Sequence, residues 1–120
     1  PYNHVSLNSS AGHVIENSRF MTTVPTGGSE TRALFMGPKA DGEVTIADNY
    51  FGGAFTDSGK YSTAAWNRGI WSDGGGVTLN ITGNTFEHIR SPMNLDGYND
   101  AITDVSGNTA SAAATVSVSK

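Results

Sequence analysis

The sequence contains no cysteine and few charged residues, which limits what can hold the fold together. With Cys 0 in 120 residues, neither disulfide bonds nor thiolate metal sites are available. Charged residues make up 15%, below the usual quarter or so, and the formal net charge of −4 argues against a broad nucleic-acid-binding surface. No apolar run is long enough for a membrane span, and no segment has the i, i+3, i+4 spacing of an amphipathic helix. The abundant Gly, Ser, Thr and Asn instead favour short strands joined by polar turns.

A short motif recurs along the chain with constant internal spacing. An aliphatic residue is followed three positions later by Ser or Asn, and five positions later by Phe or Ala. The motif starts at Ile15, Ile46, Ile81 and Val105. These starts are 31, 35 and 24 residues apart, a spacing typical of solenoids. The longer units carry their extra residues in one place, between the Phe position and the next strand, as a stack of coils tolerates.

A second recurring feature is a pair of alternating, mostly apolar residues. The pairs are Val5/Leu7, Leu34/Met36, Ile70/Ser72, Met93/Leu95 and Val116/Val118. Together with the corner motif they predict an all-β fold over residues 1–120: one domain, with three short strands per coil and about four coils. The general preference of parallel connections predicts a right-handed coil.

The segment Val44-Thr45-Ile46-Ala47-Asp48-Asn49-Tyr50-Phe51 resembles the V-x-I-x-x-N-x-F signature of the right-handed parallel β-helix superfamily. That superfamily includes pectate-lyase-like enzymes, tailspikes and secreted adhesins, and the resemblance covers nearly the whole chain. It specifies architecture and says little about function. Within this frame, two sets of residues acquire structural roles. The interior is filled by Phe20, Phe51 and Phe86, and a ladder of polar corner residues is formed by Ser18, Asn49, Asn84 and Asn108.

Residues adjacent to the buried pairs should point outward and form one face of the stack, because strand side chains alternate. These outward residues are Ser6, Phe35, Trp71, Asn94 and Ser117. Arg32 and Arg68 align just before the same strands, and Arg90 is offset by one position. Two long loops, 21–31 and 52–67, are expected to border this face, and Ser62 to Trp66 are expected to make one helical turn.

Two interpretations of this face are open. In one, it is a groove for an extended, acidic glycan, because aromatic rings stack on sugars and guanidinium groups pair with carboxylates or sulfates. The residues of that groove are Phe35, Trp71, Asn94, Arg32, Arg68, Arg90, Tyr61 and Trp66. In the other, the second loop covers the aromatic residues as a small satellite core, the arginines stack on the rings, and the chain is a purely structural stalk.

A catalytic alternative rests on a further resemblance. The segment Phe86–Pro92 looks like the part of pectate lyases in which a catalytic arginine lies two residues before a proline. Arg90 matches that arginine, and His88 is its neighbouring candidate. This resemblance implies a polysaccharide lyase or epimerase. The second arginine of the family's R-x-P-x-x-R pattern falls on Leu95, and its W-I-D-H segment has no counterpart here.

We therefore expect a non-catalytic module of a secreted or cell-surface protein. Its expected partners are a polysaccharide or surface glycan and neighbouring β-helix coils or copies of itself, without nucleic acid or a membrane span. No cofactor is expected, although the aligned Asp73 and Asp96 are weak candidates for calcium ligands. Neither end carries an evident capping element, so we also expect the chain to be a segment of a longer protein or to stack end to end.

Overall fold

The computed structural model describes residues 2–8, 12–22, 31–53, 66–73, 76–87, 89–95 and 101–110. Within these ranges all regular structure is β, with twelve short strands and no helix. The strands are β1 (Tyr2–Leu7), β2 (His13–Glu16), β3 (Arg19–Thr22), β4 (Thr31–Met36), β5 (Gly42–Ala47), β6 (Tyr50–Gly53), β7 (Trp66–Ser72), β8 (Val77–Thr82), β9 (Thr85–Phe86), β10 (Ile89–Leu95), β11 (Ala101–Ser106) and β12 (Thr109–Ala110).

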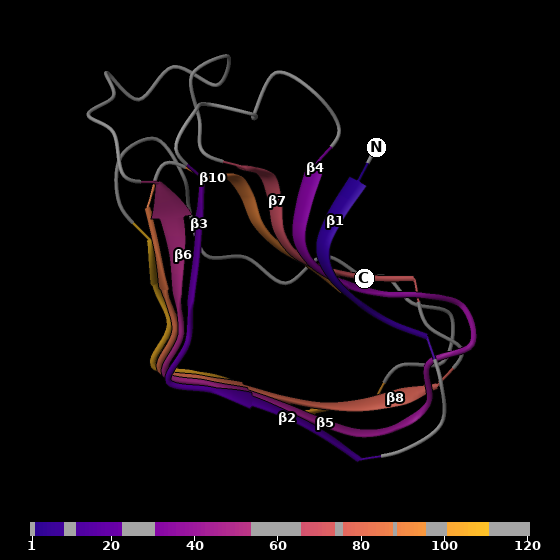
Figure 1. Cartoon of the computed structure of the whole chain (residues 1–120). Helices are drawn as coiled ribbons and strands as arrows, with labels where there is room; N and C mark the ends of the chain where they lie inside the picture. Colours follow the sequence, from indigo (N-terminus) through magenta and orange to yellow (C-terminus); the bar gives the residue numbers. More distant parts are fainter. Residues whose placement is uncertain are drawn as a thin grey trace.

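The strands form three parallel sheets of four strands each, ordered β1-β4-β7-β10, β2-β5-β8-β11 and β3-β6-β9-β12. We call these the first, second and third sheets. The chain passes through them in that order four times, and each passage is called a coil. Figure 1 looks along the stack, so the strands of each sheet lie one behind another around a common interior. The predicted all-β class is confirmed, and the arrangement is compatible with a parallel β-helix of about four coils.

The interior is built from the alternation of side chains along each strand. In β8, Val77, Leu79 and Ile81 are fully buried, while the residues between them are only half-buried. The predicted inward pairs of coils two to four are likewise buried: Leu34, Met36, Ile70, Ser72, Met93 and Leu95. Since strand side chains alternate with a period of two, the register of each coil follows from its apolar positions.

A column of phenylalanines runs through the interior, as the sequence predicted. The ring of Phe51 stacks on that of Phe20 at 4.7 Å and on that of Phe86 at 4.9 Å, with the planes within 8° of parallel. Gly69 lies against this column: a Cβ there would stand 2.5 Å from the Pro92 carbonyl oxygen and 2.9 Å from Phe86 Cε1. The rings therefore need a residue without a side chain at this position of the first sheet.

The corner between the second and third sheets is held by the predicted ladder. Asn84 is fully buried, and its Nδ2 donates to the Ile46 carbonyl at 3.0 Å and to Asn108 Oδ1 at 2.9 Å. Its Oδ1 accepts from both the backbone N–H and the Nδ2 of Asn49, at 3.0 Å each. All of this amide's hydrogen-bonding capacity is thus used between adjacent coils.

The same bonds recur one coil earlier and one coil later. Asn49 Nδ2 donates to the Ile15 carbonyl, and Asn108 Nδ2 donates to the Ile81 carbonyl. Ser18 occupies the ladder position of the first coil, where its N–H donates to Asn49 Oδ1 and its hydroxyl donates to the Glu16 carbonyl instead of reaching an adjacent coil.

Each ladder residue follows a residue with left-handed backbone geometry. The φ angles are +53° at Asn17, +57° at Asp48, +67° at Gly83 and +69° at Gly107. Glycine adopts this region freely, and Asn and Asp tolerate it better than other residues. The sharp corner therefore depends on two consecutive positions, the left-handed residue and the ladder residue that follows it.

Candidate functional site

The outer face of the first sheet gathers the predicted outward residues in two rows that run across the strands. Ser6, Phe35, Trp71 and Asn94 are consecutive partners in the strand register and form one row. Arg32 pairs with Arg68, and Arg68 pairs with Ser91. The predicted alignment is confirmed for these residues, including the offset by which Arg90 falls out of the arginine row. Ser117, the fifth residue predicted for the outward row, lies outside the described residues.

A bend in β4 brings the two rows together. Ala33 and Leu34 are both fully buried although they are consecutive, so the strict in–out alternation is broken between them. As a result Arg32 and Phe35, three residues apart, both lie on the outward, half-buried side. In a regular strand they would point to opposite faces.

The arginines and aromatic rings of this face interleave. The Arg32 guanidinium lies 4.4 Å from the centroid of Phe35 and 4.3 Å from that of Trp71, so it is held between two rings. The Arg68 guanidinium lies 4.2 Å from the same Trp71 centroid, and the two rings meet edge to face at 6.0 Å. Cation–π contacts of this kind contribute about 0.5–2 kcal/mol each, so the four side chains, which we call the arginine–aromatic stack, form one packed unit.

The stack has more hydrogen-bond donors than acceptors. Within the described part of the chain, the Nε atom of Arg32 and the Nε1 atom of Trp71 are buried and have no hydrogen-bond partner. Arg32 also makes no ion pair there. A guanidinium carries five N–H donors and an indole one, and neither group accepts. Such a face is therefore suited to a ligand that supplies oxygen acceptors.

Other residues predicted for this site lie partly or wholly outside the described structure. Tyr61, His88 and Asp96 fall there, as do the side chains of Arg90 and Trp66. The backbone of Trp66 is described, and it corrects one expectation: Trp66 is the first residue of β7 and pairs with Ile89, so it does not end a helical turn. The other residues of the expected turn, Ser62 to Ala65, lie outside the described residues.

The calcium expectation concerns Asp73 and Asp96. Asp73 is exposed, and its backbone N–H donates to the Met36 carbonyl at 2.8 Å, which is a turn contact between coils. Among the described residues no three His, Cys, Asp or Glu side chains come together as metal ligands.

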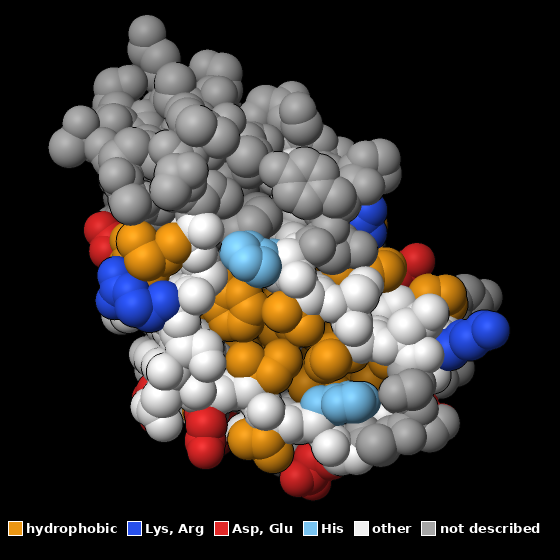
Figure 2. All heavy atoms as spheres, viewed as in Figure 1, with side chains coloured by type: hydrophobic (Ala, Val, Ile, Leu, Met, Phe, Trp, Pro, Cys, Tyr) orange, Lys and Arg blue, Asp and Glu red, His pale blue; other side chains and the backbone are white. Residues whose placement is uncertain are grey.

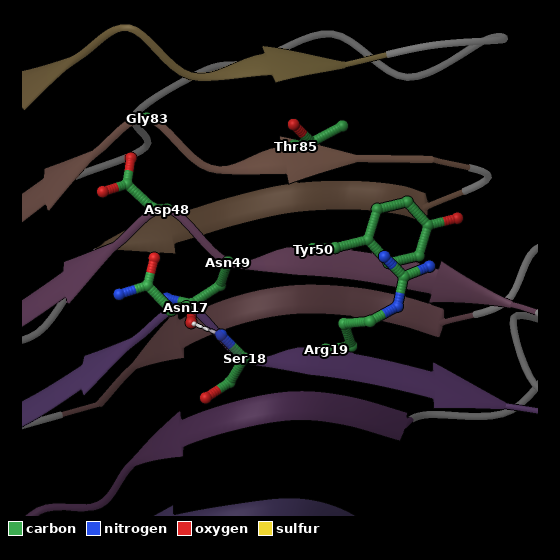
Figure 3. Close-up of a pocket in the computed structure, with 8 residues that line it drawn as sticks. All are labelled: Asn17, Ser18, Arg19, Asp48, Asn49, Tyr50, Gly83 and Thr85. Atoms are coloured by element: carbon green, nitrogen blue, oxygen red, sulfur yellow. Dashed lines mark hydrogen bonds between the residues drawn. The ribbon is translucent and has the colours of Figure 1, made fainter.

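A second surface feature was not predicted. An open depression of about 480 Å³ lies at the ladder corner, lined by Asn17, Ser18, Arg19, Asp48, Asn49, Tyr50, Gly83 and Thr85 (Figure 3). There the Arg19 guanidinium lies 4.3 Å from the Tyr50 ring centroid, and its Nε contacts Met21 Sδ at 3.3 Å. Arg19 and Tyr50 each follow the ladder residue of their coil, so comparison of the repeats position by position would have paired them.

The pKa of the Tyr50 phenol at this corner is raised. Burial raises its pKa above the ordinary value, and the negative charge of Glu87 and a hydrogen bond to that carboxylate raise it further. The positive charge of Arg19 acts in the opposite direction and is the smallest of these effects. The net result favours the neutral phenol, which is the form that can donate to Glu87.

Comparison with known proteins adds no assignment: no family model, no curated protein and no solved structure matches this chain. Among the described residues no helix is long and apolar enough to cross a membrane. The site must therefore be interpreted from its own chemistry.

Proposed function

We propose that this chain is a right-handed parallel β-helix module that binds an extended acidic glycan across the outer face of its first sheet. The handedness follows the strong general preference of parallel connections. The module has no catalytic role of its own in this proposal, and it acts in a secreted or cell-surface protein, where acidic polysaccharides are found.

The proposal rests on the surroundings of the Arg32 side chain. Its guanidinium is half-buried between the rings of Phe35 and Trp71, yet its Nε has no acceptor among the described residues. Holding a cation against two rings fixes its orientation, so little further entropy is lost when an anion binds. Because the Nε atom itself is buried, a carboxylate or sulfate would accept from the more exposed part of this half-buried side chain.

The polar residues that flank the arginine–aromatic stack within each row favour an extended ligand. Along the aromatic row, Phe35 and Trp71 are flanked by Ser6 on one side and Asn94 on the other. Ser91 follows Arg68 in the arginine row. Adjacent strands lie about 4.8 Å apart, so four strands offer polar contacts over roughly 15 Å with the charged pair in the middle. A glycan with an acidic residue between neutral hydroxyl-bearing residues fits that order.

The net charge of −4 does not oppose this interaction strongly. Charges further away than about 10 Å are largely screened at physiological ionic strength, whereas the two arginines would contact the ligand directly. Binding should therefore weaken as salt is added, because the ion pairs with the ligand are partly exposed.

The test compares Arg32→Met with Arg19→Met. Methionine keeps an apolar side chain against the rings and removes the charge and the donors. Both arginines stack on aromatic rings at nearly the same distance, 4.3 Å from Trp71 and 4.3 Å from Tyr50, but they lie on different sheets. Titration calorimetry with a polyuronate should show binding about 10- to 100-fold weaker for Arg32→Met, as expected for losing a charged hydrogen bond, and unchanged for Arg19→Met. A neutral glucan of matched length serves as the ligand control.

Two results would refute the proposal. One is equal binding by Arg32→Met and the unmodified chain. The other is no binding of acidic glycans by the unmodified chain, which would leave the arginine–aromatic stack as packing within a structural stalk.

A further inference from the structure

The depression at the ladder corner, which we call the corner depression, is bordered by opposite charges on two sides. Its lining comes from three consecutive coils. Figure 3 shows the Asp48 carboxylate on one side and the Arg19 guanidinium on the other, with Ser18 and Asn49 between them. In Figure 2, charged side chains lie around the rim of the described surface and hydrophobic ones gather in its middle. The corner belongs to that rim (Figure 1), so a ligand there would meet mainly charged and polar groups.

The two charges are not paired with each other. The Arg19 guanidinium lies 4.3 Å from the centroid of the Tyr50 ring, and its Nε contacts Met21 Sδ at 3.3 Å. Asp48 is exposed, and its Oδ1 lies where a side chain at Gly83 would stand. Within the described part of the chain neither Arg19 nor Asp48 forms an ion pair. Two opposite charges that border one hollow without pairing favour a ligand that carries both charges.

Both charged side chains are supported by their surroundings. Tyr50 carries Arg19 on its ring, and its hydroxyl forms a hydrogen bond with the Glu87 carboxylate. Asp48 has left-handed backbone geometry, with a φ of +57°, and its N–H donates to the Thr82 carbonyl of the next coil at 3.0 Å. Groups that are held in place before a ligand arrives lose less entropy when it binds.

The separation of the two charges sets the length of the ligand. Asp48 and Tyr50 are two residues apart in one coil, about 6.6 Å in an extended chain. Arg19 is the register partner of Tyr50 on the neighbouring strand, about 4.8 Å away. The Cα atoms of Asp48 and Arg19 therefore lie about 8 Å apart. Their charged groups lie further apart, because Asp48 leans toward Gly83 in the next coil. Arg19 leans the other way, toward Met21 in its own strand.

A dipeptide has the reach that this separation requires. The nitrogen and the carboxylate carbon of a free amino acid are about 2.5 Å apart, so with a charged hydrogen bond of about 2.8 Å at each end it reaches only about 8 Å. A second residue extends that reach to about 12 Å. The peptide group in the middle both donates and accepts, as do the side chains of Asn17 and Thr85, which also line the depression.

We propose that the corner depression binds a zwitterion of the size of a dipeptide, with the ligand's ammonium group at Asp48 and its carboxylate at Arg19. The depression lies between the second and third sheets, away from the arginine–aromatic stack on the first. A polyuronate is not a ligand of this site, because it lacks the ammonium group and would meet the carboxylates of Asp48 and Glu87.

Dialanine is the probe, and two capped forms of it test the two ends of the site separately. N-acetyl dialanine lacks the ammonium group, and dialanine amide lacks the carboxylate. Binding is followed through the amide chemical shifts of the folded chain in an NMR titration, which suits weak ligands. An exposed ion pair strengthens binding by about two- to fivefold, so dialanine should bind about two- to fivefold more tightly than either capped form. Free alanine, which is too short to reach both charges, should bind as weakly as the capped forms.

Substitutions in the chain test the same two contacts. Asp48→Asn is a matched change, because Asn17 holds the equivalent position one coil earlier with a φ of +53°. It should weaken dialanine binding about two- to fivefold and leave N-acetyl dialanine binding unchanged. Arg19→Met keeps an apolar side chain against the ring, and it should weaken the binding of dialanine but not of dialanine amide. Asp104→Asn removes an exposed carboxylate outside the depression, which accepts from the Ser106 hydroxyl, and should leave dialanine binding unchanged.

Three results would overturn the proposal. One is the absence of chemical-shift changes at the corner with dialanine. The second is equal binding of dialanine and both of its capped forms. The third is equal weakening of dialanine and N-acetyl dialanine binding by Asp48→Asn. Because dialanine binding depends on Arg19 and polyuronate binding on Arg32, this proposal and the proposed function fail separately.

Discussion

Removing the central amide of the ladder should cost more stability than removing any other polar side chain described here. The change is Asn84→Ala. It deletes the donor to the Ile46 carbonyl and the donor to Asn108 Oδ1, and it deletes the acceptor for the N–H and the Nδ2 of Asn49. Asn84 is 0% exposed, so water cannot easily replace these partners.

The size of the effect follows from the groups left behind. The Asn49 N–H is buried and has Asn84 Oδ1 as its partner, and the Ile46 carbonyl loses its Asn84 donor. A buried polar group deprived of its partner costs about 1–3 kcal/mol, so two such groups cost about 2–6 kcal/mol. The lost side-chain volume adds a smaller cavity cost. We expect a loss of about 3–5 kcal/mol, a large part of the 5–15 kcal/mol that stabilises a typical domain.

Urea unfolding followed by circular dichroism measures this loss, with Ser18→Ala as the matched control. Ser18 occupies the same ladder position in the first coil, but its hydroxyl makes one exposed hydrogen bond, to the Glu16 carbonyl at the end of the preceding strand, at 3.0 Å. Its removal should cost under about 0.5 kcal/mol. Asn108→Ala, at a half-buried position with fewer bonds, should fall between the two. Equal losses for Asn84→Ala and Ser18→Ala would refute the idea that the ladder stabilises the corner.

Three further substitutions concern two glycines and a tyrosine. Gly69→Ala should destabilise the fold by about 1–3 kcal/mol in the same assay, because the new Cβ meets the Phe86 ring at 2.9 Å. Gly107→Asn should cost less than Gly69→Ala, because the nearest atom to its Cβ is 3.6 Å away and Asn tolerates a φ of +69°; the reverse order would contradict this account. Because the folded-state pKa of Tyr50 is raised, its neutral form contributes stability that is complete below about pH 10 and is lost as pH rises through the raised pKa. The denaturation midpoint of Tyr50→Phe should therefore fall less steeply above pH 10 than that of the unmodified chain, and parallel curves would contradict the shift.

The corner of each coil was predictable because its positions repeat and interlock. Ile46, Asn49 and Phe51 keep a fixed spacing, and the same spacing returns in the next coil. A buried amide can be satisfied only by equivalent groups directly above and below it, so the motif tolerates no shift in register. The pairing of Phe35 with Trp71 could be predicted in the same way. The buried residues on either side of each show which residues of the two strands point inward and therefore which residues are paired.

The structural interpretation of this face predicted that the arginines stack on the rings, and they do; which arginine meets which ring was not predictable in the same way. Arg32 and Phe35 share a face only because Ala33 and Leu34 are buried in succession, and alanine gives no signal of such a bend. Trp66 was misplaced for a related reason: Ser62 offers a local helix cap, but the strand pairing of Trp66 with Ile89 is a contact between coils. Strand pairing between coils outweighs local conformational propensity, and local propensity cannot show which residue of another coil a strand residue pairs with.

The division between an invariant corner and a variable edge explains where a binding face can arise in this fold. Between the second and third sheets the chain turns through two residues, and an inserted residue there would separate Asn84 from Asn49 and Asn108. The connections that precede β4, β7 and β10, residues 23–30, 54–65 and 87–88, differ in length. The first two of these strands, β4 and β7, carry Arg32 and Arg68. The sequence can therefore change at the start of the first sheet without disturbing the ladder, because the ladder bonds lie at the corner between the second and third sheets. That separation allows the outer face of the first sheet to hold donors such as Arg32 Nε and Trp71 Nε1, which have no acceptor among the described residues, a composition that the tightly bonded corner would not tolerate.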